Sequence, residues 1–249
     1  MTTPPHSAAA AAPGAPARPN TLLELAITII VPAVVLMQLS EASRLGPVKA
    51  LLLALAFPIG YGVWDFLRRR HFSWLAALGL ASTLLTGGIG LLALDPQWLA
   101  VKEAAVPGVI GLAVLASTRT RAPLIRTLVF NPALFDVERV QAQLDARGTT
   151  AAFERRLSTG TLLLAGTFFF SAVMNYGLAR WIVTSPAGSE AFNQELGRLT
   201  LLSYPLIALP SMAMMIGLLY WLARAARELT GLPLSEMLRH EQAAQRPPG

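Results

Sequence analysis

The sequence predicts an all-α fold, a polytopic transmembrane helical bundle of about six spans with both termini in the cytoplasm. Three observations support this class: the chain of 249 residues is 54% hydrophobic, only 14% of its residues are charged, and its mean hydropathy is +0.52. Soluble domains carry about 25% charged residues, so this chain has too few charges to cover a water-facing surface. We therefore expect lipid to surround most of it.

The first 20 residues, MTTPPHSAAAAAPGAPARPN, are rich in Ala and Pro and show no hydrophobic periodicity. This composition predicts a disordered N-terminal tail. A cleaved secretory signal is the alternative interpretation. It is disfavoured because a single basic residue, Arg18, precedes the first apolar run and an acidic one, Glu24, lies inside it.

Apolar runs long enough to cross a bilayer follow, since about 20 helical residues span the hydrocarbon. Residues 21–117 hold four of them, and residues 160–222 hold two more; the runs are 22–39, 48–67, 72–94, 98–117, 160–181 and 199–222. Inside lipid a helix satisfies all of its own backbone hydrogen bonds. We therefore expect each run to be a transmembrane helix.

Residues 118–159 are predicted to form a cytoplasmic loop, and residues 223–249 a cytoplasmic C-terminal tail. The stretch FDVERVQAQLDARG in the loop has apolar residues at near-helical spacing: Phe135, Val137, Val140 and Leu144. Asn131-Pro132 before it and Gly148 after it are start and stop signals. We expect a short amphipathic helix on the membrane surface, with partner binding as the alternative.

The orientation follows from the distribution of basic residues. Fifteen of the 20 Lys and Arg residues fall on the side of the termini, and the other side holds only Arg44, Lys49, Lys102, Arg180 and Arg198. Basic residues are enriched on the cytoplasmic side of membrane proteins, so both termini are predicted to be cytoplasmic. The same excess of Arg explains the net charge of +6 without nucleic acid.

Few residue types in this chain could support cofactor or metal chemistry. It has no cysteine, and its three histidines are far apart in the sequence: His6, His71 and His240. Thiolate chemistry and a local histidine metal motif such as HExxH are therefore excluded. We expect no catalytic, cofactor-binding or metal-binding residue and no enzymatic activity.

Small residues predict how the helices pack, because membrane helices associate through close approach of their backbones. They recur every four residues in the third and fourth spans: Gly79, Thr83 and Gly87, then Ala104 and Gly108. Prolines in four spans predict breaks in the helical hydrogen bonds: Pro32, Pro58, Pro107, Pro205 and Pro210.

A charged pair near the start of the fourth span marks a candidate site. Asp95 and Pro96 predict a tight turn on the outer side, and Trp98 suits the interfacial aromatic belt. Lys102 and Glu103 then lie about a turn inside the span. We expect Lys102 to reach outward to the surface and Glu103 to face the bundle and bond to another helix; a ligand, ion or proton site is the alternative.

Two further polar residues are candidates within the spans. Asp65 precedes Arg68 and Arg69 by three and four residues, which predicts a helical ion pair. Asn175 lies deeper, in the fifth span, where it is expected to form hydrogen bonds between helices.

Several stretches resemble the bacterial intracellular septation protein A family and a closely related uncharacterised membrane protein family. The stretches are FPIGYGVWDFLRRR, TGGIGLLALDPQWLAVKEAAVP and RAPLIRTLV, with weaker matches through NYGLARWIV and EAFNQELGRLT. The resemblance implies a multi-pass protein of the bacterial inner (plasma) membrane that acts in envelope maintenance or septation. The N-terminal tail and residues 135–159 depart from the family pattern, which weakens the transfer of a division role.

Two functions are compatible with these features. The first is a non-enzymatic role in the cell envelope through protein–protein contacts, with envelope or division membrane proteins, or further copies of the chain, as partners. The second is a small transporter or channel with a polar path near Glu103, Asp65 and Asn175. An enzyme acting on lipids is disfavoured, because Asp95 and Asp136 are isolated and fall on opposite predicted faces.

Overall fold

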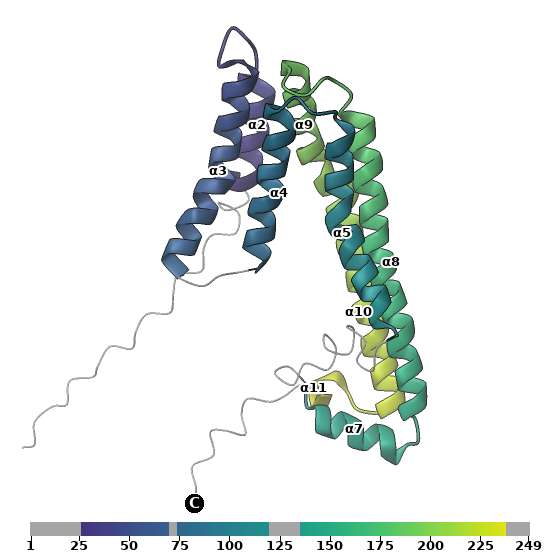
Figure 1. The fold of residues 1–249 in the computed structure, drawn as a ribbon. Helices are drawn as coiled ribbons and strands as arrows, with labels where there is room; N and C mark the ends of the chain where they lie inside the picture. Colours follow the sequence, from purple (N-terminus) through teal and green to yellow (C-terminus); the bar gives the residue numbers. More distant parts are fainter. Residues whose placement is uncertain (1–25, 70–73, 120–134, 238–249) are drawn as a thin grey trace, which may run out of the picture.

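A computed structural model describes residues 26–69, 74–119 and 135–237 of the chain. Within these ranges the secondary structure consists of helices with no strand, as the sequence predicts. The helices form two groups that meet at one end of the molecule and diverge toward the other (Figure 1).

The first group comprises a π-helical segment, η1, and three α-helices. These are η1 (Ala26–Ile30), α2 (Val31–Leu39), α3 (Gly46–Arg69) and α4 (Trp74–Leu91). The second group contains longer helices: α5 (Gln97–Ser117), α8 (Thr150–Ile182) and α10 (Leu209–Thr230). Between them, α9 (Glu190–Ser203) packs against α2 and continues into α10 through the π-helical segment η2 (Tyr204–Ala208).

Four helical segments are long and apolar enough to cross a membrane: Gly46–Trp64, Gln97–Ser117, Thr150–Ile182 and Glu190–Thr230. Two other apolar segments in the described part of the chain, Thr28–Leu39 and Leu80–Leu91, are shorter. The chain is therefore compatible with an integral membrane protein. The number of six spans and the cytoplasmic position of the termini stay predictions.

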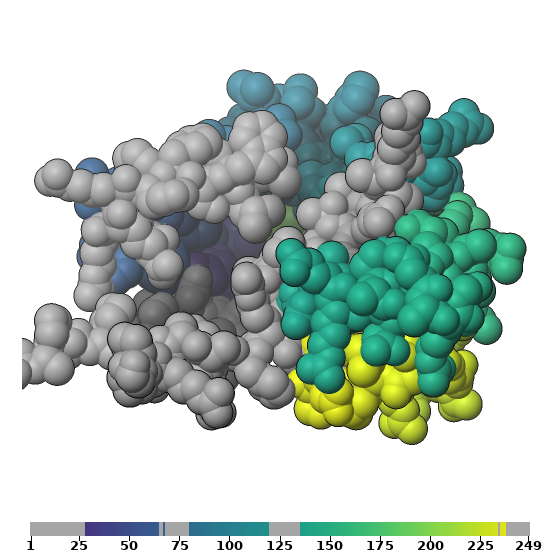
Figure 2. Space-filling model, turned by 90° about the horizontal axis from the view of Figure 1, so that it is seen from below, coloured from purple at the N-terminus to yellow at the C-terminus, as the bar shows by residue number. Residues whose placement is uncertain are grey.

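Two apolar cores hold the fold together. The first lies where the groups meet and joins α2, α3, α5, α8 and α9 around the fully buried Phe192. The second lies toward the opposite end and joins α5, α8 and α10 to α7 (Val137–Ala146) and α11 (Leu234–Met237). Seen from that end, α7 and the start of α8 lie beside the end of α10 and α11 (Figure 2).

The amphipathic helix predicted in the 118–159 segment is α7. It begins after Asp136, whose side chain accepts a hydrogen bond from the Arg139 amide, and it ends before Gly148 at a φ of +63°; the predicted start signal Asn131-Pro132 lies outside the described residues. Its apolar residues Val140 and Leu144 are buried in the second core. This apolar face therefore packs on the chain's own helices and faces neither lipid nor a partner. The following helix already begins at Thr150, so α8 extends well beyond the predicted span.

The prolines act in two ways. Helices α3 and α5 continue through Pro58 and Pro107, so the hydrogen bond that each proline cannot donate does not end the helix. Pro32 follows η1, and Pro205 lies within η2 with Pro210 just beyond it. Because proline has no N–H to donate to the carbonyl four residues earlier, the backbone at these places widens into a π turn.

Candidate functional site

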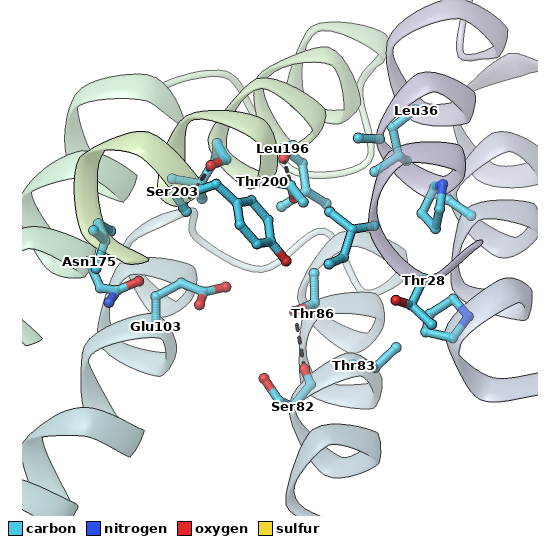
Figure 3. A pocket seen from close by; sticks show the side chains of 18 of the residues that line it. Thr28, Leu36, Ser82, Thr83, Thr86, Glu103, Asn175, Leu196, Thr200 and Ser203 are labelled. Carbon is cyan, nitrogen blue, oxygen red and sulfur yellow. Dashed lines mark hydrogen bonds between the residues drawn. The ribbon is translucent and has the colours of Figure 1, made fainter. Parts of the chain in front are cut away.

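A cavity of about 610 Å³ lies where the two groups of helices meet. It is bounded by η1, α2, α3 and α4 on one side and by α5, α8, α9, η2 and α10 on the other. Both π-helical segments contribute to its wall, and π turns occur frequently at functional sites. Glu103 and Asn175 face Thr83, Thr86 and Thr28 across this space (Figure 3).

Its lining is unusually polar for a space between apolar helices. Hydroxyl groups from both sides reach it, together with one carboxylate and one amide: Thr28, Ser82, Thr83, Thr86, Ser171, Thr200, Ser203, Tyr204, Ser211, Glu103 and Asn175. The buried Ser211 hydroxyl has no hydrogen-bond partner. Polar groups inside a membrane protein are costly and usually mark a functional site.

Most of the bonded groups offer hydrogen-bond acceptors to the cavity. The Thr200 and Ser203 hydroxyls donate to the carbonyls of Leu196 and Leu199 in their own helix, at 3.0 and 2.7 Å. Each hydroxyl has one proton and two lone pairs. Its proton is bonded to the backbone carbonyl, so its lone pairs remain free to accept a hydrogen bond from a ligand. The cavity is therefore suited to a ligand that donates hydrogen bonds.

The Lys102–Glu103 pair lies at the edge of this cavity, about 9 Å along α5 from its first residue. The Lys102 Nζ lies 2.7 Å from the Glu103 Oε1 and donates to the hydroxyls of Thr86 at 2.7 Å and Ser82 at 3.2 Å, both on α4. The Lys102 side chain is only 11% exposed, whereas that of Glu103 is 30% exposed. The ammonium thus has three acceptors, which matches its three protons.

Two predictions about this pair are wrong. Lys102 does not reach outward, because the α4 hydroxyls and the Glu103 carboxylate provide closer partners. Glu103 does not bond to another helix but to its own neighbour, and the link between α5 and α4 comes from Lys102 instead. The expectation that Glu103 faces the bundle is confirmed, since it lines the cavity.

Asn175 also lines the cavity, but its predicted bonds between helices are not found. Its amide nitrogen donates within α8, to the carbonyl and the hydroxyl of Ser171, at 2.8 and 3.2 Å. This arrangement leaves the amide oxygen as a further acceptor beside Glu103 (Figure 3).

The turn between α4 and α5 has the predicted form. The Asp95 carboxylate accepts a hydrogen bond from the Gln97 amide at 2.8 Å, and α5 begins there. Trp98 is 55% exposed in the first turn of α5, as an interfacial anchor should be. Asp95 and Trp98 are not among the residues that line the cavity.

Two of the predicted packing residues, Gly87 and Gly108, lie in contacts between helices. Gly87 lies so close to α3 that an added Cβ would sit 2.5 Å from the Leu55 Cδ1, and Gly108 faces Ala172 of α8. Thr83 lines the cavity instead, and Ala104 is partly buried on α5. Gly79 and the side chain of Asp65, with its predicted arginine partners, lie outside the described residues.

Two important polar residues were missed by sequence reasoning. The fully buried Asn193 of α9 donates to the Ser40 hydroxyl and the Pro47 carbonyl, at 3.0 and 2.7 Å. The Glu195 carboxylate accepts bonds from the backbone N–H groups of Thr184 and Ser185 and from both hydroxyls. In the sequence the two residues stand out only as part of EAFNQELGRLT, one of the stretches that resemble the septation family.

Comparisons with known protein families, with curated proteins and with solved structures found no match to this chain.

Proposed function

We propose that this integral membrane protein transports a small, polar, amine-bearing solute through the cavity at Glu103. The single observation that supports this proposal is a carboxylate placed among hydroxyl groups in a cavity between apolar helices. Its volume of about 610 Å³ lies within the range of 300–1,000 Å³ that is typical of small-molecule sites.

The class of solute follows from the acceptors that line the cavity. The carboxylate of Glu103, the amide oxygen of Asn175 and the hydroxyl oxygens of Thr200 and Ser203 all accept hydrogen bonds. A protonated primary amine with further hydroxyl groups would match them, because its N–H and O–H groups donate hydrogen bonds. Such a cation would compete with Lys102 for the Glu103 carboxylate, whereas the bonds of Lys102 to Ser82 and Thr86 of α4 do not involve that carboxylate.

The route follows from the arrangement of the helices. Below the cavity the two groups diverge toward the end that carries α7 (Figure 1). The arginines at the start of α8 and at the end of α10 are on this end: Arg155, Arg156, Arg224 and Arg227. We place this end in the cytoplasm of a bacterial inner membrane, in keeping with the positive-inside rule. The cavity would then be open to the cytoplasm and closed on the outer side by the turn at Asp95 and the connection at Glu195.

Binding can be tested with purified protein in detergent and a panel of choline, spermidine, putrescine, glucose and glutamate. A ligand that binds the folded state raises the melting temperature. We expect an amine to raise it for the wild type and for Glu138→Gln, a control on the exposed face of α7, but not for Glu103→Gln. The amine should also accumulate in proteoliposomes of the wild type and of Glu138→Gln, but not in those of Glu103→Gln. Equal responses of the two variants, or a response to glutamate only, would contradict the proposal.

The resemblance to the septation family supports a second proposal, a non-enzymatic role in envelope maintenance or septation through contacts with division or wall-elongation proteins. Such a scaffold depends on its packing surfaces and not on the Glu103 carboxylate. Complementation of a deletion strain separates the two functions. A Glu103→Gln protein that is present at normal abundance and restores the envelope supports the scaffold, whereas loss of complementation supports transport.

A further inference from the structure

A second polar feature lies at the end of the molecule away from the cavity, where the start of α8 packs beside the end of α10. Two adjoining grooves of about 430 and 370 Å³ share Tyr220, Arg224 and Glu228 in their walls. The first groove also reaches Arg227, and the second reaches Arg156 and Trp221. We call these six residues the basic foot.

Positive charge is in excess in the basic foot, because three arginines share one carboxylate. Arg224 is oriented by a hydrogen bond from its Nε to the Glu228 Oε1, at 2.8 Å. The guanidinium carbon of Arg156 lies 5.3 Å from the centroid of the Trp221 ring, a distance at which a cation interacts with the face of the ring. Both arginines are therefore held in place while the 68% exposed Arg224 side chain remains open to a ligand.

The basic foot lies at the level expected for the membrane surface. Tyr220 and Trp221 come at the end of the apolar run 199–222, and such aromatic residues gather at the interface between lipid and water. Arg224 follows one turn later, about 6 Å farther along the helix axis. This is the depth at which the phosphate groups of a bilayer lie.

An apolar strip on α10 leads from the membrane interior to the basic foot. Met212, Ile216 and Leu219 are 55%, 58% and 51% exposed. Met212, Ile216, Tyr220 and Arg224 follow one another at a spacing of four residues, which places each beside the next along the helix surface, and Leu219 lies at the edge of this row. The acyl chain of a lipid can lie along this strip while its headgroup lies among the arginines. A free phosphate ion has no acyl chain and could not contact the strip.

We infer that the basic foot binds the headgroup of an anionic phospholipid, with a phosphodiester oxygen between Arg156 and Arg224. A guanidinium group suits this ligand because its parallel N–H groups match two phosphate oxygens. Basic pockets between helices on the cytoplasmic side are known to hold anionic headgroups. The inference does not depend on the proposed transport function, since the basic foot is separate from the cavity.

The test is native mass spectrometry of the full chain in detergent with added phosphatidylglycerol, and with phosphatidylcholine as the uncharged reference. We expect phosphatidylglycerol adducts on the wild type and roughly fivefold weaker binding for each of Arg156→Gln and Arg224→Gln, the size of effect of one arginine near an anionic surface. Glu228→Gln should bind more tightly, because it removes the only carboxylate of the foot.

Arg198→Gln is the matched control, since this arginine is also exposed but lies on α9 near the other end of the molecule. It should bind phosphatidylglycerol as the wild type does. Wild-type binding by the Arg156 and Arg224 variants would overturn the inference, and so would equal binding of phosphatidylcholine. Displacement of the lipid by inorganic phosphate alone would show a free anion site instead. Melting curves of each variant identify any loss of folding.

Discussion

The contact between α9 and α2 gives a prediction whose size can be worked out from the structure. Gly197 of α9 lies directly against α2. A Cβ added there would sit 2.6 Å from the Met37 Cγ and 2.9 Å from the backbone oxygen of Ala33. Met37 can move aside, but the carbonyl of Ala33 belongs to the helix and cannot. Gly197→Ala therefore forces the two helices apart.

Overpacking of this kind costs about 1–3 kcal/mol, and the better helix propensity of Ala returns about 1 kcal/mol. We expect a net loss of up to about 2 kcal/mol. Gly217 of α10 is the matched control, because nothing lies within 4 Å of an added Cβ there. Gly217→Ala keeps the gain in propensity without the clash, so the two variants should differ by the cost of overpacking, about 1–3 kcal/mol with a middle value of about 2 kcal/mol.

Thermal unfolding in detergent, followed by tryptophan fluorescence, measures the difference. A gap of about 2 kcal/mol corresponds to roughly 4–8 °C for a chain of this size. Gly197→Ala should melt below the wild type and Gly217→Ala at or above it. Equal melting temperatures, or a more stable Gly197→Ala, would refute the close approach of α9 to α2.

Three further predictions concern polar contacts. Lys102→Met removes the ammonium that donates to the Glu103 carboxylate and to the Thr86 hydroxyl. Because both acceptors lose this donor, we expect the free energy of unfolding to fall by about 1–3 kcal/mol. A melting temperature equal to that of the wild type would contradict this. Glu195→Ala removes the carboxylate that caps the 183–189 connection, so limited proteolysis should cut there sooner than in the wild type, and unchanged cleavage would count against the cap. Hydrogen bonds from Thr150 and then Gln141 lower the pKa of Asp145 below its ordinary value of 3.8. The folded state therefore favours the charged carboxylate, and Asp145 contributes to the stability of the fold. This contribution is complete above about pH 4 and is lost as the pH falls through the pKa of the folded state. Thr150→Val should raise that pKa in a carbon-13 NMR titration, and an unchanged value would show that the bond does not act on it.

Composition and apolar run lengths were enough to predict an all-helical membrane protein, because the lack of charge leaves few alternatives to a lipid environment. They also identified the turn at Asp95 and placed Glu103 toward the bundle. The hydrogen-bond partners of a largely buried polar side chain could not be predicted from the sequence, as Lys102 shows. Its ammonium bonds to Ser82 and Thr86, which are 20 and 16 residues away, and only the tertiary arrangement brings them within reach.

The prolines show a similar limit. Pro58 and Pro205 look alike in the sequence, yet α3 continues through the first and a π turn forms at the second. The difference depends on whether neighbouring helices can accept the displaced backbone, and this is a property of packing. Asn193 was missed for the same reason, since its partners Ser40 and Pro47 are about 150 residues away along the chain.

The most direct test of a polar cavity inside the membrane uses the natural absence of cysteine in this chain. Ser171 and Val173 lie at the same depth of α8, but Ser171 lines the cavity and Val173 is 71% exposed on the outer surface. Each is replaced by cysteine in turn, and membrane vesicles are treated with a water-soluble, quaternary-ammonium thiol reagent. The structure predicts that Ser171→Cys reacts and that Val173→Cys, covered by lipid, does not. A reactive Val173→Cys beside an inert Ser171→Cys would contradict the account.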